Sequence, residues 1–234
     1  MALAFLISLA VLPSLLIAVF LYYQDKHEKE EHRHLWGAFF WGCLTIVPSF
    51  FFEFFLIQAD GSPLYHAFVV AALPEEFFKF AFLYFFIFHK AYFNEPYDGI
   101  IYAAFVSLGF ATVENLMYIL ECYAQKGWQE GLRVAWLRML MAIPGHATWG
   151  IFMGFYMGIA KFHPRSPWPY LLWGLLVAVV AHGSYDYFLF EKKYQYLASL
   201  AIAMLVLSVA VAYRAMRIHQ ARSPFKPVRS EVDE

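Results

Sequence analysis

Seven long apolar segments, joined by short polar connections, make up most of this chain of 234 residues. A helix needs about 20 predominantly apolar residues to cross a bilayer, and each segment approaches or exceeds that length. Hydrophobic residues form 62% of the sequence and charged residues 15%, whereas a globular domain usually carries about 25% charged residues. The sequence therefore predicts an all-α fold, a polytopic transmembrane helical bundle of about seven spans. The expected spans are 2–23, 35–58, 64–89, 97–121, 134–160, 168–190 and 195–217.

The two ends of the chain differ. Residues 2–23 carry no basic residue ahead of them and no small-residue cleavage site, which favours a retained span over a cleaved signal peptide. Residues 218–234 combine proline, serine and mixed charges without periodicity, which predicts a disordered cytoplasmic tail after a transmembrane domain at 1–217. Cys43 and Cys122 are expected near opposite membrane faces, too far apart to form a disulfide.

The lysines and arginines predict the orientation, because cytoplasmic loops carry an excess of them. Eleven of the 17 fall in the connections and tail that share a side with the C-terminus, and five fall on the other side. We therefore expect a multi-pass protein of the cell membrane with its N-terminus outside and its C-terminus in the cytoplasm. The bilayer is its expected surrounding, and a formal net charge of −1 gives no sign of nucleic-acid binding.

Ionisable residues inside the expected spans are the main functional candidates. Each costs roughly 2.5–3.5 kcal/mol at the bilayer centre on insertion scales, so such residues usually serve a function. Glu53 lies near a helix end, where we expect it to snorkel to the interface, and Asp98 lies near an interface, where we expect it to be solvated. The remaining candidates are Glu75, Glu76, Lys79, Glu114, His146, His182 and Asp186.

Four of these residues share a depth. Counted from the outer span ends, Glu75, Glu114, His146 and His182 lie in one slab roughly 10–18 Å below the outer surface, at 1.5 Å per residue. They come from four different helices. Structural polar residues would be scattered in depth, so the shared depth predicts one common site.

The spacing within the helices supports this prediction. Glu75 and Lys79 are four residues apart and can pair on one helix face, as can His182 and Asp186. Pro74 and Pro144 weaken helical hydrogen bonding directly before Glu75 and His146. Irregular helix at membrane depth is tolerated where it lines a water-filled cavity, so we expect water beside the glutamates.

Several chemistries fit such a site. A buried glutamate can activate water while a histidine stabilises the oxyanion, without a cofactor. Alternatively, Glu75, His146 and His182 can bind zinc, although the sequence contains no HExxH motif. A proton- or cation-coupled transporter also uses such residues, but we find no repeated halves. A binding protein without turnover is a further alternative.

Four motifs in order resemble the PrsW family of intramembrane proteases, within the wider superfamily of CAAX-processing and bacteriocin-immunity membrane proteases. The motifs are Glu75-Glu76-Phe-Phe-Lys79, Gly109-Phe-Ala-Thr-Val-Glu114-Asn115, His146 in PGHATWG, and His182-Gly-Ser-Tyr-Asp186. They cover about residues 70–190.

The resemblance implies roles for the residues of three of the four motifs. Glu75 and Glu76 would activate water with help from His146, and His182 and Asp186 would lie near the oxyanion. Glu114 and Asn115 match a motif without a clear role, and Lys79 would be a pairing cation by analogy. The implied activity is endopeptidase cleavage of a single-span membrane protein, such as an anti-sigma factor, from the extracytoplasmic side. Residues 1–217 would then be a protease domain. We expect the metal-free mechanism, with zinc as the alternative.

Overall fold

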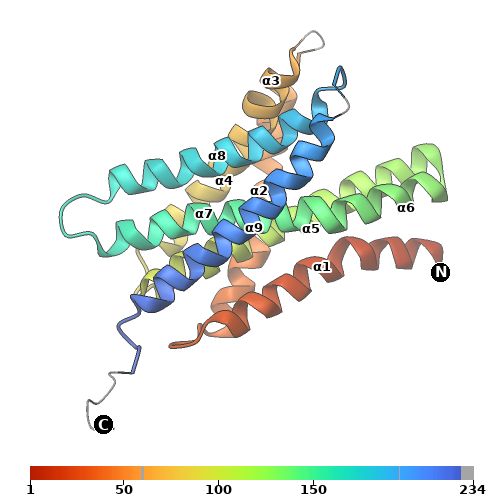
Figure 1. Cartoon of the computed structure of the whole chain (residues 1–234). Helices are drawn as coiled ribbons and strands as arrows, with labels where there is room; N and C mark the ends of the chain where they lie inside the picture. The colour runs from red at the N-terminus through yellow and green to blue at the C-terminus, as the bar shows by residue number, and fades with distance from the viewer. Residues whose placement is uncertain (59–60, 195, 228–234) are drawn as a thin grey trace.

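The computed structural model describes residues 1–58, 61–194 and 196–227, and all regular secondary structure within them is helical. The helices form one bundle (Figure 1). Five of them are long and apolar enough to cross a membrane: α1 (Ala2–Gln24), α2 (His32–Leu56), α5 (Pro96–Lys126), α8 (Trp168–Phe190) and α9 (Leu197–Ala221). The prediction of an all-α membrane bundle is confirmed.

Each of the other two expected spans is a run of helical segments in which α-helix alternates with π-helical turns. The first comprises α3 (Pro63–Tyr65), η1 (His66–Ala72), α4 (Leu73–Phe82) and η2 (Leu83–Ile87), and the second comprises α6 (Trp128–Leu137), η3 (Arg138–Ala142) and α7 (Ile143–Phe162). The π-helical turns η1 and η3 end directly before Leu73 and Ile143, the first residues of α4 and α7. In each of these two helices the second residue is a proline, Pro74 or Pro144. Proline lacks an N–H and its ring collides with the carbonyl of residue i−4, so the preceding turn widens.

Helix α5 is the centre of the bundle and packs most extensively against α7 and α2. Almost every residue from Tyr97 to Asn115 is buried. Glycines allow the close crossings: a Cβ on Gly109 would collide with the carbonyl of Phe39 in α2, and one on Gly154 with the carbonyl of Gly99. The α5–α7 crossing is thus a contact between backbones.

The outer helices expose large apolar side chains. Phe51 and Phe54 on α2, Leu172 on α8 and Leu207 on α9 are each more than half exposed. Exposed apolar surface of this extent marks a membrane-facing or binding surface in a folded protein. In a bundle of apolar helices of membrane-spanning length, lipid is the natural contact.

The C-terminal end differs from the sequence prediction. Helix α9 continues to Ala221, so the expected disorder is wrong for residues 218–221, and the predicted tail at 228–234 lies outside the described residues. The extension is held by packing: the Gln220 amide donates to the Gln24 carbonyl at the end of α1, and the His219 ring contacts the Phe155 carbonyl oxygen at 2.8 Å. Cys43 and Cys122 are both free thiols, as expected.

Candidate active site

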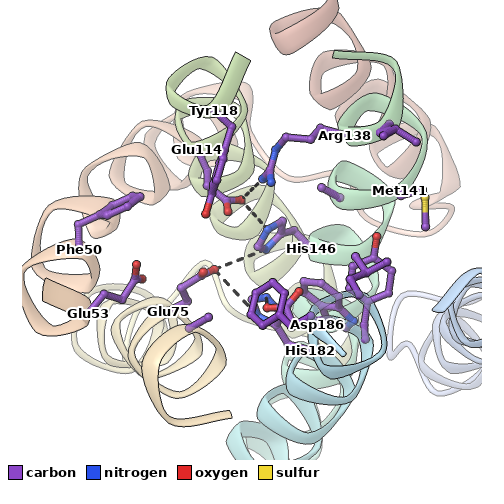
Figure 2. A pocket seen from close by; sticks show the side chains of 17 residues that line it. Phe50, Glu53, Glu75, Glu114, Tyr118, Arg138, Met141, His146, His182 and Asp186 are labelled. Carbon is purple, nitrogen blue, oxygen red and sulfur yellow. Dashed lines mark hydrogen bonds and ion pairs between the residues drawn. The ribbon is translucent and has the colours of Figure 1, made fainter. Parts of the chain in front are cut away.

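A cavity of about 270 Å³ lies among α2, α4, α5, α7 and α8, and the expected polar residues surround it (Figure 2). Glu75, Glu114, His146 and His182, which the sequence placed at one depth, are brought together here from four helices. Asp186 also lines the cavity, whereas Glu76, Lys79 and Asn115 lie behind its wall. The charged and imidazole residues of the lining are Glu53, Glu75, Glu114, Arg138, His146, His182 and Asp186.

The two adjacent glutamates occupy different environments. They follow Pro74 in the first turn of α4, and successive helical residues point about 100° apart. Glu75 faces the cavity, while Glu76 is fully buried. The Lys79 ammonium contacts both, at 3.3 Å from Glu75 Oε2 and 2.8 Å from Glu76 Oε1. Burying these charges together lowers the cost of placing them in the bundle.

His146 is held between a cation and an anion. Its Nδ1 lies 3.1 Å from Lys79 Nζ, and its Nε2 lies 2.9 Å from Glu114 Oε2. An ammonium group only donates hydrogen bonds, so Nδ1 accepts from Lys79 and the ring proton resides on Nε2, donated to Glu114. The contacts therefore hold a neutral imidazole in one tautomer, with Nδ1 4.0 Å from Glu75 Oε2.

His182 has a carboxylate at each ring nitrogen. Nδ1 lies 2.9 Å from Glu76 Oε1, and Nε2 lies 3.2 Å from Asp186 Oδ2. Ionised carboxylates only accept hydrogen bonds, so this pattern places a proton on both nitrogens. Trp149 stacks on the ring with centroids 3.9 Å apart, which fixes its plane. The expected His182–Asp186 contact is present.

Arg138 is a site residue that the sequence analysis missed. Arg138 is one of the five lysines and arginines expected on the outer side. However, η3 places it at the cavity, where Nη2 lies 2.6 Å from Glu114 Oε2 and Nε donates to Asn115 Oδ1 at 2.7 Å. Glu114 thus links Arg138 to His146. Its position four residues inside the expected span 134–160 was the signal that could have identified it.

Glu53 also differs from expectation. Instead of snorkelling to the interface, it lines the cavity from α2, beside Glu75 in Figure 2. Its Oε1 is buried without a hydrogen-bond partner among the described residues. The helix extends only to Leu56, and its rotation turns this residue inward.

The donor set also fits a metal ion. Glu75, Glu76, His146 and His182 each offer one buried ligand atom, and these atoms lie within 4.8 Å of one another. Oxygen and imidazole donors in this number suit zinc. Lys79 Nζ contacts three of the same residues, at 2.8–3.3 Å, so an ion at their centre and the ammonium group exclude each other.

Fold and site together define a polytopic helical membrane protein with a buried glutamate–histidine centre. Residues 30–214 match the family described as "PrsW family intramembrane metalloprotease". The chain belongs to the PrsW family of intramembrane proteases.

Curated relatives agree with this assignment. The chain is 38% identical to Protease PrsW of Geobacillus kaustophilus, with 80% of this chain and 81% of the relative covered. It is 33% identical to Protease PrsW of Bacillus subtilis, with 79% and 82% covered, and 30% identical to that of Oceanobacillus iheyensis, with 92% and 96% covered. No solved structure matches the chain significantly. None of these matches names the wider superfamily, which stays a prediction.

Proposed function

We propose that the chain is an endopeptidase that cleaves a membrane-anchored protein by means of a water molecule activated by Glu75. The observation that carries the proposal is the cavity itself, where a carboxylate, a neutral imidazole and a doubly hydrogen-bonded imidazole meet beside space for a peptide group. Family membership supplies the protease class.

Glu75 is the proposed general base. It faces the cavity, whereas Glu76 is fully buried and bonded to Lys79 and His182. In the proposed step, the water gives its proton to the Glu75 carboxylate while its oxygen attacks the peptide carbonyl. Glu75 then gives the proton to the amide nitrogen, the C–N bond of the tetrahedral intermediate breaks, and the products are a carboxylic acid and an amine, with the Glu75 carboxylate restored.

The histidines have separate proposed roles. His182, with hydrogen bonds at both nitrogens, places positive charge at the cavity wall, where it stabilises the oxyanion of the tetrahedral intermediate. His146 presents Nδ1 toward Glu75 and orients the carboxylate through Lys79. Glu76, Glu114, Asn115, Asp186 and Arg138 are proposed as positioning residues because they act through these groups.

A zinc-dependent variant of the same hydrolysis is the second candidate. It is favoured by the four buried ligand atoms within 4.8 Å and by the description of the matching family as a metalloprotease. Glu75, Glu76, His146 and His182 would hold the ion, and Lys79 would have to withdraw. Zinc bound there would supply Lewis-acid activation of water. Metal analysis of purified protein separates the two mechanisms, since zinc at one ion per chain, lost in His146→Ala, supports the second.

The proposed substrate is a single-span membrane protein similar to an anti-sigma factor, cut near its extracytoplasmic end. The depth of the site and the lysine–arginine asymmetry, which favours an outside N-terminus and a cytoplasmic C-terminus, support that side of cleavage. The apolar part of the cavity lining, including Phe50, Met141 and Leu189, suits a membrane-embedded peptide.

The test is cleavage of single-span peptides in detergent, with the cut sites mapped by mass spectrometry. Glu75→Gln and His146→Ala should abolish cleavage while the protein stays folded. Glu121→Gln, at an exposed carboxylate further along α5, should cleave normally. Full cleavage by both site variants, or ion uptake into liposomes without any peptide cleavage, would contradict the proposal.

A further inference from the structure

A second group of buried carboxylates lies at the opposite end of α5 from the candidate active site. Asp98, in the first turn of α5, is sixteen residues before Glu114, or roughly 24 Å along the helix axis. Four further acidic residues join it, three from the α1–α2 connection and one at the start of α5. We call Asp25, Glu28, Glu30, Glu95 and Asp98 the distal carboxylate cluster.

The cluster is buried, contrary to the sequence expectation that Asp98 is solvated. Asp25, Glu30, Glu95 and Asp98 are each no more than 4% exposed, and Glu28 is half-buried. Two sets of hydrogen bonds hold these carboxylates in the interior: Glu95 and Asp98 form a capping box at the start of α5, and Tyr102 donates to Glu30 of the α1–α2 connection. The burial is therefore built by local hydrogen bonds, with the carboxylates as acceptors.

Each of the five carboxylates keeps one oxygen atom that is buried and has no hydrogen-bond partner among the described residues. The nearby lysines form no ion pair with these carboxylates: Lys29 donates to the carbonyls of Tyr22 and Asp25, and Lys161 donates to those of Phe88 and Lys90. Within the described residues, no ion pair reaches the cluster. Buried charge without a partner is costly, so such carboxylates are paired, bind a metal or are protonated.

A buried tyrosine lies near the cluster. Tyr97 is fully buried, its hydroxyl has no hydrogen-bond partner among the described residues, and it lies in the electrostatic field of Asp25 and Glu95. The cluster therefore has more acceptor oxygens than donors, and no cation of the described residues forms an ion pair with it.

We propose that Glu28, Glu95 and Asp98 bind a hard divalent cation of the Ca²⁺ or Mg²⁺ class. Their ligand oxygens lie within 4.8 Å of one another, and oxygens around one Ca²⁺ ion, bound at about 2.3–2.6 Å, are separated by no more than about 5 Å. The donors are all oxygen, which selects hard cations over zinc or copper. The ion would join the α1–α2 connection to the start of α5, independently of peptide cleavage.

Terbium luminescence tests this proposal, because Tb³⁺ replaces Ca²⁺ at oxygen sites and is excited through nearby tyrosines such as Tyr97 and Tyr102. Chelator-treated protein in detergent should show saturable emission at one Tb³⁺ per chain, displaced by Ca²⁺ or Mg²⁺, whichever is the preferred ion. Glu28→Gln should weaken binding at least about tenfold, as loss of a ligand exceeds the effect of losing an outer-shell partner.

Two controls localise the signal. Glu31→Gln alters an exposed carboxylate of the same connection, which pairs with Arg33 instead, and should bind Tb³⁺ normally. Glu75→Gln, at the candidate active site, should also bind normally. Unchanged affinity in Glu28→Gln, absence of saturable emission from the wild type, or loss of emission in Glu75→Gln would overturn the proposal.

Thermal unfolding tests the same metal site without relying on terbium luminescence. Ca²⁺ or Mg²⁺ should raise the Tm of the chelator-treated wild type and of Glu31→Gln by at least about 2 °C, as a ligand of the folded state does. Glu28→Gln should fold in the absence of metal, because its carboxylate has no partner to lose, and should show no such rise. An equal rise in Glu28→Gln would contradict the assignment.

Discussion

The adjacent residues Glu75 and Glu76 show how one position along a helix changes the role of a carboxylate. Glu75 faces the cavity, and Glu76 is enclosed by Lys79 and His182. The sequence identified the pair but left open which residue is the base, since that depends on the rotation of α4. The surroundings of each carboxylate lead us to assign chemistry to the first and positioning to the second.

The pair yields a prediction that separates the two roles. Glu75→Gln should lower kcat by about 10²–10⁴ with little change in Tm, because it removes general-base catalysis. Glu76→Gln should also lower kcat, but it should cost about 3–5 kcal/mol of stability, because Lys79 and His182 lose a fully buried partner. Thermal unfolding and cleavage rates measured on the same preparations check this, and equal Tm values for the two variants would contradict the assignment.

Arg138 yields a second prediction at this scale. Arg138→Lys should keep the charge but lose the simultaneous contacts to Glu114 and Asn115, because only a guanidinium presents both donors in fixed geometry. We expect kcat to fall about tenfold or more with a smaller change in KM, since His146 loses its orientation through Glu114. Arg133→Lys, at an exposed pair with Glu130, is the matched control and should behave as wild type. Identical kinetics in the two variants would show that Arg138 has no positioning role in catalysis.

Among the helices, the crossing of α5 and α7 depends on glycine. A Cβ at Gly154 meets the Gly99 carbonyl, whereas one at Gly37 in α2 meets nothing within 4 Å. Gly154→Ala should therefore destabilise the protein by about 1–3 kcal/mol through overpacking, while Gly37→Ala should be neutral or stabilise it by up to about 1 kcal/mol. Tm measurements in detergent check this, and a tolerated Gly154→Ala would show that the crossing can relax.

Much at the scale of elements was predictable from the sequence, because apolar length and polar connections are local signals. All seven expected spans are helical paths, with ends displaced by a few residues. The positions of Arg138 and Glu53 were not predictable in this way. The π-helical turn η3 alters the rotation of the residues around it, and inward placement of Glu53 depends on neighbours distant in the sequence.

For the molecule as a whole, the convergence of four helices on one cavity was predictable from shared depth, since depth follows from counting residues. The distal carboxylate cluster was not. In the sequence, its acidic residues look like those of any solvent-exposed loop. They are buried only because the α1–α2 connection packs against the start of α5. Connections carry no periodicity from which burial can be inferred.

The proposed orientation can be tested with the two native cysteines. Cys122 lies in the last turns of α5, at the end expected outside, whereas Cys43 lies within α2, with its Sγ 3.3 Å from the Gly109 carbonyl. A membrane-impermeant maleimide added to intact cells should label the wild type and Cys43→Ala, but not Cys122→Ala. Labelling of the wild type only after the cells are lysed would reverse the proposed topology.

The glycine crossing described above also bears on how a long polypeptide reaches Glu75. Gly99 and Gly154 lie outside the cavity lining, but their backbone contact leaves no side-chain layer on which α5 and α7 could slide. The helices that carry Glu114 and His146 are therefore held firmly together. Phe50 and Glu53 near the end of α2 and Leu189 and Phe190 at the end of α8 line the cavity. If a peptide enters from the bilayer, we expect it to pass between those two helix ends rather than between α5 and α7.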